Sequence, residues 1–132
     1  MNRIVARFQD GRVLKGFTND FLPGKASFHL LSEGEQAGDK VEEVPVAQLK
    51  ALFFVKSFAG DPKYEEAREF AEGKPVAGRR IRVVFKDGEL IVGTTQGYDR
   101  SRPGFFVVPA DPASNNERCF VVVAATQEVT FI

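Results

Sequence analysis

Cysteine, histidine, methionine and tryptophan are almost absent from this chain of 132 residues, which has one Cys, one His, one Met and no Trp. Cys119 has no partner for a disulfide and lies in the apolar run CFVVVAA, so we expect a buried thiol rather than a nucleophile. His29 has no second His or Cys close in sequence to share a metal. We therefore expect no catalytic residue, no metal site and no cofactor, and predict that the protein is not an enzyme.

An excess of charge is also lacking, because 18 Lys and Arg balance 18 Asp and Glu. This balance gives no indication of avid non-specific binding to nucleic acid. No apolar run approaches the roughly 18 residues of a membrane span, and the start MNRIVARFQDGR has no secretory signal. These absences predict a soluble, cytoplasmic protein with no membrane partner.

Phenylalanine, by contrast, is abundant, with 13 residues in a chain that is 43% hydrophobic. That content argues for a folded core and against disorder.

The sequence resembles itself when it is shifted by 77 residues. RIVARFQDGRVLKGFTNDF, from Arg3, then lies over RIRVVFKDGELIVGTTQGY, from Arg80, and the alignment continues without a gap to the last residue. It contains 12 identities in 53 positions, placed at turn glycines and alternating apolar sites. We interpret the two segments as an internal duplication.

Each unit is predicted to contain five short strands with alternating apolar residues. Asp-Gly in QDGR and KDGE is a strong hairpin signal, because Gly adopts the positive φ of a tight turn. Gly16 and Gly93 fall in the middle of the second strand, which indicates a bend or a close backbone approach. The predicted fold is mainly β: two tandem five-stranded small β-barrels joined by one α-helix.

The joining helix is predicted from DPKYEEAREFAEGK, where Asp61 is a good N-cap and Pro62 suits the first helical position. The expected organisation is a first barrel over residues 1–58, a linking helix over 59–75 and a second barrel over 76–132.

The second unit resembles the first motif of Sm-like proteins through Gly88, Gly93, Tyr98 and Asp99. The resemblance implies a small barrel, of the kind also found in Src-homology-type domains, and RNA as a possible ligand. Pro103 stands where that family has a base-binding Asn, and the Arg-Gly of its second motif is replaced by AATQ.

The stretch YDRSRPGFF also contains the D-x-S-x-x-G pattern of PilZ domains, which bind cyclic di-GMP, in Asp99, Ser101 and Gly104. Arginines before and inside this stretch suit an anionic ligand. The candidate ligand-binding residues are Arg80, Arg82, Asp99, Arg100, Ser101 and Arg102. The alternative is a simple turn with solvated arginines, since Asp, Ser and Gly are common turn residues.

The stretch ALFFVKSF is apolar on both faces of a strand, so some of its side chains need a covering partner. The candidate interaction surface is Phe17, Phe53, Val55 and Phe58. We expect the other barrel to cover this surface first, and a protein partner or self-association to be the alternative.

The segment GTTQGYDRSRPGFFVVPADPASNNERCFVV, finally, resembles a bacterial domain family of uncharacterised function. The function predicted from the sequence is a non-catalytic binding or interaction module of bacterial regulation. The alternative is binding of an anionic nucleotide, such as cyclic di-GMP, or of RNA at the arginine-bearing end of the second barrel.

Overall fold

The structure is a computed structural model that describes residues 1–32, 40–60, 66–68, 70 and 77–132. This described part of the chain contains strands, two single-turn 3₁₀ helices and no α-helix. The expectation of a mainly β fold is confirmed. The predicted joining helix over 59–75 lies largely outside the described residues, and the residues that are described there are not helical.

The described residues contain ten strands, five in each half, as the alternation of apolar residues predicts. They are β1 (Asn2–Phe8), β2 (Val13–Thr18), β3 (Ser27–Ser32), β4 (Val41–Pro45), β5 (Leu49–Val55), β6 (Arg79–Phe85), β7 (Leu90–Thr95), β8 (Gly104–Pro109), β9 (Asn116–Val122) and β10 (Thr126–Phe131). The 3₁₀ turns η1 (Val46–Gln48) and η2 (Val123–Ala125) precede β5 and β10.

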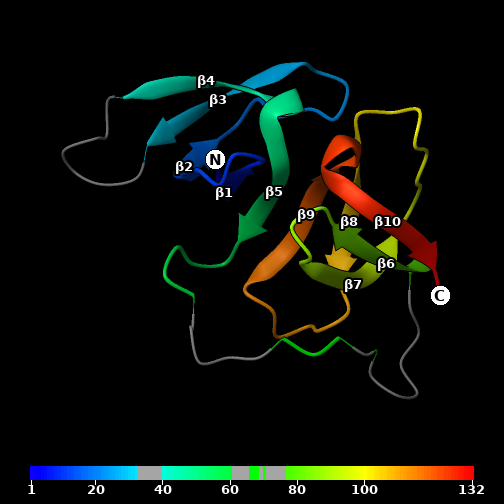
Figure 1. Ribbon diagram of the computed structural model, residues 1–132. Coiled ribbons are helices and arrows are strands. Elements are labelled where there is room, and N and C mark those ends of the chain that lie inside the picture. The colour runs from blue at the N-terminus through cyan, green and yellow to red at the C-terminus, as the bar shows by residue number, and fades with distance from the viewer. Residues whose placement is uncertain (33–39, 61–65, 69, 71–76) are drawn as a thin grey trace.

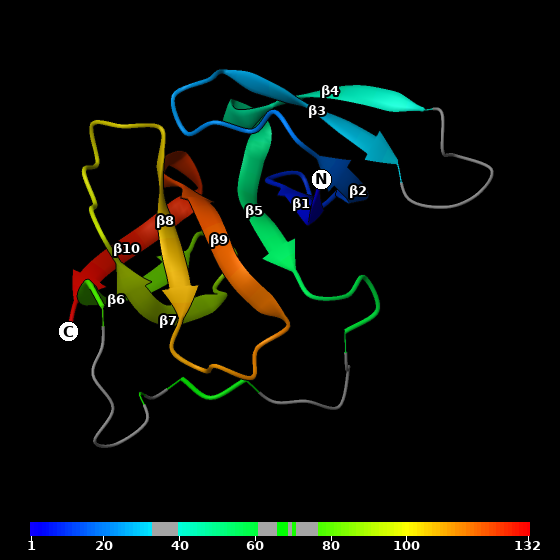
Figure 2. The same cartoon turned by 180° about the vertical axis from the view of Figure 1, so that it is seen from behind.

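All ten strands belong to one open antiparallel sheet with the order β10-β6-β7-β8-β9-β5-β1-β2-β3-β4. The prediction of two tandem five-stranded barrels is not supported, because β5 of the first unit pairs directly with β9 of the second, as Figures 1 and 2 show from opposite sides. The sheet is continuous because the last strand of one unit extends the sheet of the other.

Within each half, the strand pairings repeat with the same offset of 77 residues as the sequence. Ile4 pairs with Gly16 and Ile81 with Gly93, and the strand order 5-1-2-3-4 recurs as 10-6-7-8-9. The gapless alignment thus matches equivalent backbone positions, while the duplication that would explain it stays an interpretation.

The hairpin glycines adopt the conformation that the Asp-Gly signal predicts. Gly11 has φ 95° and Gly88 has φ 91°, in the left-handed region that Gly enters without strain. A carboxylate oxygen of Asp10 and of Asp87 accepts a 2.9 Å hydrogen bond from the backbone N–H two residues on. The two turns therefore have the same local chemistry.

Gly16 and Gly93 allow a close approach between neighbouring strands. A Cβ atom on either would collide with a carbonyl oxygen, that of Leu31 or that of Val108. The close backbone approach predicted for the strand-centre glycines is confirmed.

The hydrophobic residues form two cores that share one wall, made of β5 and β9. Every residue of β5 is buried: Leu52 and Phe54 face the first-half core, whereas Phe53 and Val55 face the second-half core. Phe120 of β9 reaches the other way, into the first-half core. Each half thus completes the core of the other, which explains why the two do not form independent barrels.

Candidate functional site

The stretch Tyr98–Phe106, which covers part of the β7–β8 connection and the first residues of β8, begins as an ordinary turn. Oδ1 of Asp99 accepts hydrogen bonds from the backbone N–H and the hydroxyl of Ser101, at 2.9 and 2.7 Å. These bonds, helped by the positive charge of Arg102, lower the pKa of the Asp99 carboxyl. The backbone N–H of Arg102 donates to the Asp99 carbonyl at 3.0 Å and closes the turn.

The corresponding loop of the first half makes the same turn without the motif. The backbone N–H of Lys25 donates to the carbonyl of Leu22 at 3.0 Å, at positions 77 residues earlier. D-x-S-x-x-G is therefore not needed for the turn, and the carboxylate of Asp99 is engaged in local hydrogen bonds rather than held open for a ligand.

A cavity of about 460 Å³ lies beside this loop, and we call it the Tyr98 cavity. Residues of the β7–β8 connection and Pro23 of the β2–β3 connection line it, and Figures 1 and 2 locate these two connections in the fold. Its lining is Pro23, Thr95, Gln96, Gly97, Tyr98, Asp99, Arg102, Gly104, Phe105, Phe106 and Phe120. Both halves of the chain thus contribute to it.

Only two of the six predicted ligand residues, Asp99 and Arg102, line the Tyr98 cavity. Arg80 and Arg82 are exposed on β6, and the guanidinium of Arg80 lies 4.6 Å from the centre of the Phe70 ring. Arg100 is exposed in the loop. Among the described residues, Arg102 is thus the one predicted arginine that lines the Tyr98 cavity, and Arg80, Arg82 and Arg100 do not line it.

The aromatic floor of the Tyr98 cavity depends on Gly104. A Cβ atom at this position would collide with the ring of Phe120 and with the carbonyl oxygen of Val121. Because Gly104 has no side chain, β8 lies close against β9, and the ring of Phe106 packs 5.2 Å from that of Phe120, edge to face. Gly104 therefore shapes the cavity rather than contacting a ligand through a side chain.

Phe21, which sequence reasoning did not single out, joins this floor to the first half. Its ring lies 5.1 Å from that of Phe120 and 6.2 Å from that of Phe106, and it also packs against Phe28 and Phe54. The alignment held a signal for it, since Phe21 is the counterpart of the cavity residue Tyr98.

The predicted interaction surface is largely covered within the chain. Phe53 and Val55 are only 5% and 6% exposed, packed in the second-half core. Phe17 and Phe58 are half-buried and pack edge to face, with ring centres 5.3 Å apart. The covering partner expected first, the other half of the chain, is the one that the structure shows for Phe53 and Val55.

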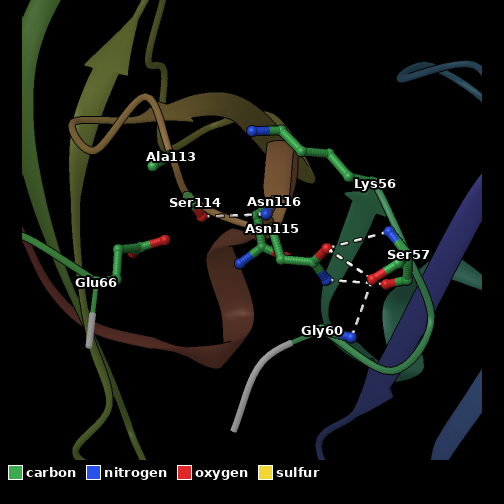
Figure 3. A pocket seen from close by; sticks show the side chains of 8 residues that line it. All are labelled: Lys56, Ser57, Gly60, Glu66, Ala113, Ser114, Asn115 and Asn116. Carbon is green, nitrogen blue, oxygen red and sulfur yellow. Dashed lines mark hydrogen bonds between the residues drawn. The ribbon is translucent and has the colours of Figure 1, made fainter. Parts of the chain in front are cut away.

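A second, polar cavity of about 420 Å³ lies between the segment that follows β5 and the β8–β9 connection, and Figure 3 shows its lining residues. The side chain of Asn115 accepts hydrogen bonds from the N–H and hydroxyl of Ser57 and donates one to the Ser57 carbonyl, at 3.0, 3.2 and 2.9 Å. The Ser57 hydroxyl accepts from the N–H of Gly60, and Lys56 donates to the Pro112 carbonyl. Many of the polar groups around this cavity thus form hydrogen bonds with one another. We interpret these bonds as structural, since they hold the segment after β5 against the β8–β9 connection.

The only Cys and the only His of the sequence have structural surroundings rather than a catalytic setting: Cys119 is buried and His29 pairs with Asp20. Burial raises the pKa of the Cys119 thiol to about 12, so the buried, unreactive thiol predicted from the sequence agrees with the structure. Nδ1 of His29 lies 2.7 Å from Oδ2 of Asp20, and this hydrogen bond lowers the pKa of Asp20 to about 2. The sequence did not indicate this partner, because Asp20 follows β2 and His29 lies on β3, nine residues later.

The chain belongs to a family of unknown function, DUF6982, whose model matches residues 1–132. This agrees with the resemblance to an uncharacterised domain family. No curated protein and no solved structure matches the chain. No helix in the described ranges is long and apolar enough to cross a membrane.

Proposed function

We propose that this chain is a non-catalytic binding module whose site is the Tyr98 cavity, and that it takes a small ligand with a planar ring and an anionic group. The observation that carries this proposal is the position of Arg102 on the same cavity lining as Tyr98, Phe106 and Phe120. Guanidinium groups pair with phosphate or carboxylate, and aromatic faces stack on planar rings. A volume of about 460 Å³ also suits a small molecule.

The position of the cavity supports the same function. It lies between two loops from different halves, and its floor is the aromatic cluster that joins those halves. The predicted interaction surface is less suited to a partner than the Tyr98 cavity, because two of its four residues, Phe53 and Val55, are buried inside the chain. A role in bacterial regulation stays a prediction of the family resemblance.

Kinship with Sm-like barrels also remains a proposal. Five strands in each half, a glycine in the second strand and a single 3₁₀ turn before the fifth strand support it. Pro103, which has no side-chain hydrogen bond to give, argues against RNA binding by the Sm mode.

The test is calorimetric titration of the protein with adenosine and guanosine 5′-monophosphate. We expect saturable binding that weakens roughly ten- to a hundredfold in Arg102→Ala, since a charge-assisted hydrogen bond contributes ~1.5–3 kcal/mol. Arg82→Ala removes the same charge from an exposed strand residue outside the cavity and is the matched control. The proposal would be contradicted if neither nucleotide bound, or if Arg102→Ala and Arg82→Ala lost affinity equally.

A further inference from the structure

We infer that the ligand of this site carries two anionic groups, and that Arg118 holds the second one; the inference rests on the proposed function. Arg118 lies on β9 and is exposed, and neither the sequence patterns nor the family assigns it a role. The ligand class that this position fits is a linear dinucleotide, with one phosphate at Arg102 and the next at Arg118.

The guanidinium of Arg118 lies against two aromatic rings on neighbouring strands. Its central carbon is 4.3 Å from the ring centre of Phe54 on β5 and 4.8 Å from that of Phe106 on β8. These two rings are 6.2 Å apart. Contact with two rings restricts the position of the guanidinium, and the residue as a whole is exposed, which suits a preformed phosphate site.

Arg118 also stands between two cavities. Phe106 belongs to the lining of the Tyr98 cavity, whereas Phe54 lines a smaller cavity of about 230 Å³, which we call the Asn2 cavity. A ligand that leaves the Tyr98 cavity over Phe106 therefore meets Arg118 before it reaches the Asn2 cavity. The order along this path is Arg102, the ring of Phe106, Arg118 and then the Asn2 cavity, with Phe54 buried beneath Arg118.

The Asn2 cavity has polar groups that suit the edge of a second base. Its lining is Met1, Asn2, Arg3, Phe17, Phe54, Val55 and Glu117. Asn2 offers both amide donors and an acceptor, and the carboxylate of Glu117 accepts from an exocyclic amine or a ring N–H. Of the charged groups in this lining, Glu117 is acidic and the guanidinium of Arg3 already donates to the Lys56 carbonyl and lies over the Phe58 ring, so we assign the second anion to Arg118.

Neither arginine on this path is neutralised by a close salt bridge from the described part of the chain, although the charge of Arg102 also acts on the Asp99 carboxyl. Within the described residues, neither Arg102 nor Arg118 forms an ion pair with a carboxylate. The first half has no equivalent site, because the counterparts of Arg118 and Phe106 are Val41 and His29. The two-anion path is thus specific to the junction side of the second half.

The test compares adenosine 5′-monophosphate with the linear, 5′-phosphorylated dinucleotide pApA by calorimetry at one salt concentration. We expect pApA to bind wild type at least tenfold more tightly than the mononucleotide. Arg118→Gln should abolish that advantage and leave mononucleotide binding within twofold of wild type, whereas Arg102→Ala weakens both ligands. Arg118→Lys, which keeps the charge but loses the planar fork, should retain part of the advantage.

The outcomes separate the two proposals. If the mononucleotide binds through Arg102 but pApA binds no more tightly, or Arg118→Gln leaves the advantage intact, the two-anion inference is wrong and the proposed function stands. If neither ligand binds wild type, both are wrong. Circular dichroism melting of each variant checks that the fold is retained, and Arg118→Lys provides the test if Arg118→Gln unfolds.

Discussion

Lys50 links the two halves of the sheet, and its replacement offers a direct test of their coupling. The residue follows η1 in the first half and is only 8% exposed. Its Nζ lies 2.7 Å from a carboxylate oxygen of Asp87 and 2.8 Å from one of Glu89, both in the first hairpin of the second half. The ammonium also lies 4.8 Å from the centre of the Phe85 ring.

The expected cost of Lys50→Met follows from the unequal exposure of the partners. The lysine side chain is 10% exposed, but those of Asp87 and Glu89 are 55% and 45% exposed, so both carboxylates regain water when the lysine is removed. The loss therefore lies between the ~0–1 kcal/mol of surface pairs and the ~3–5 kcal/mol of broken buried pairs. We expect about 2 kcal/mol, because methionine keeps an apolar side chain of similar length at this buried position and loses only the charged contacts.

The assay is urea unfolding of Lys50→Met beside Lys86→Met, which removes the same charge from an exposed position of the same hairpin. A loss of about 2 kcal/mol corresponds to a melting point about 6–8 °C lower in a domain of this size. The hydrogen bond to Lys50 is the main cause of the lowered pKa of Asp87, so this pKa should rise in the variant. Equal stabilities of the two variants would refute the idea that Lys50 couples the halves.

Two further predictions concern the shared core and the exposed His29–Asp20 pair. Phe53→Ala should lower the free energy of unfolding by about 3–5 kcal/mol in urea, as for a buried core Phe. The control is Thr130→Ala, 77 residues later, which should change it by less than about 0.5 kcal/mol. Similar losses in both variants would contradict the shared wall of β5 and β9. The Asp20 carboxyl should titrate near pH 2 by carbon-13 NMR and move up toward its ordinary value in His29→Ala. Because the pKa of Asp20 is lower in the folded state, its pairing with His29 stabilises the fold above about pH 4, and this stabilisation is lost as the pH falls through 2. An unchanged titration midpoint of Asp20 in His29→Ala would refute the assignment.

Local sequence signals were sufficient to place the strands and turns. Alternating apolar residues located all ten strands, and Asp-Gly located both hairpins, because these features depend on residues a few positions apart. Gly16 and Gly93 revealed the close strand approach for the same reason. The helical interpretation of 59–75, in contrast, rested on a narrow apolar stripe and is not seen in the described residues there.

The candidate site was predictable only in part. Arg102 and Asp99 were found because the motif lies in one loop, although the carboxylate of Asp99 turned out to serve the turn itself. Phe21, Phe106 and Arg118 come together from separate strands and loops across the junction, so no local pattern marks them as neighbours.

The sequence by itself thus determined the elements and their repetition, since a hydrophobic period of two and a turn glycine act within one strand or hairpin. Only the tertiary structure decided how the halves join. The apolar residues Phe53 and Val55 indicated that this face of the strand is covered, but they did not indicate which part of the protein covers it. Pairing of β5 with β9 answers this, because it lets Phe53 fill one core and Phe120 the other, and in doing so it brings Arg118 between two rings beside a cavity.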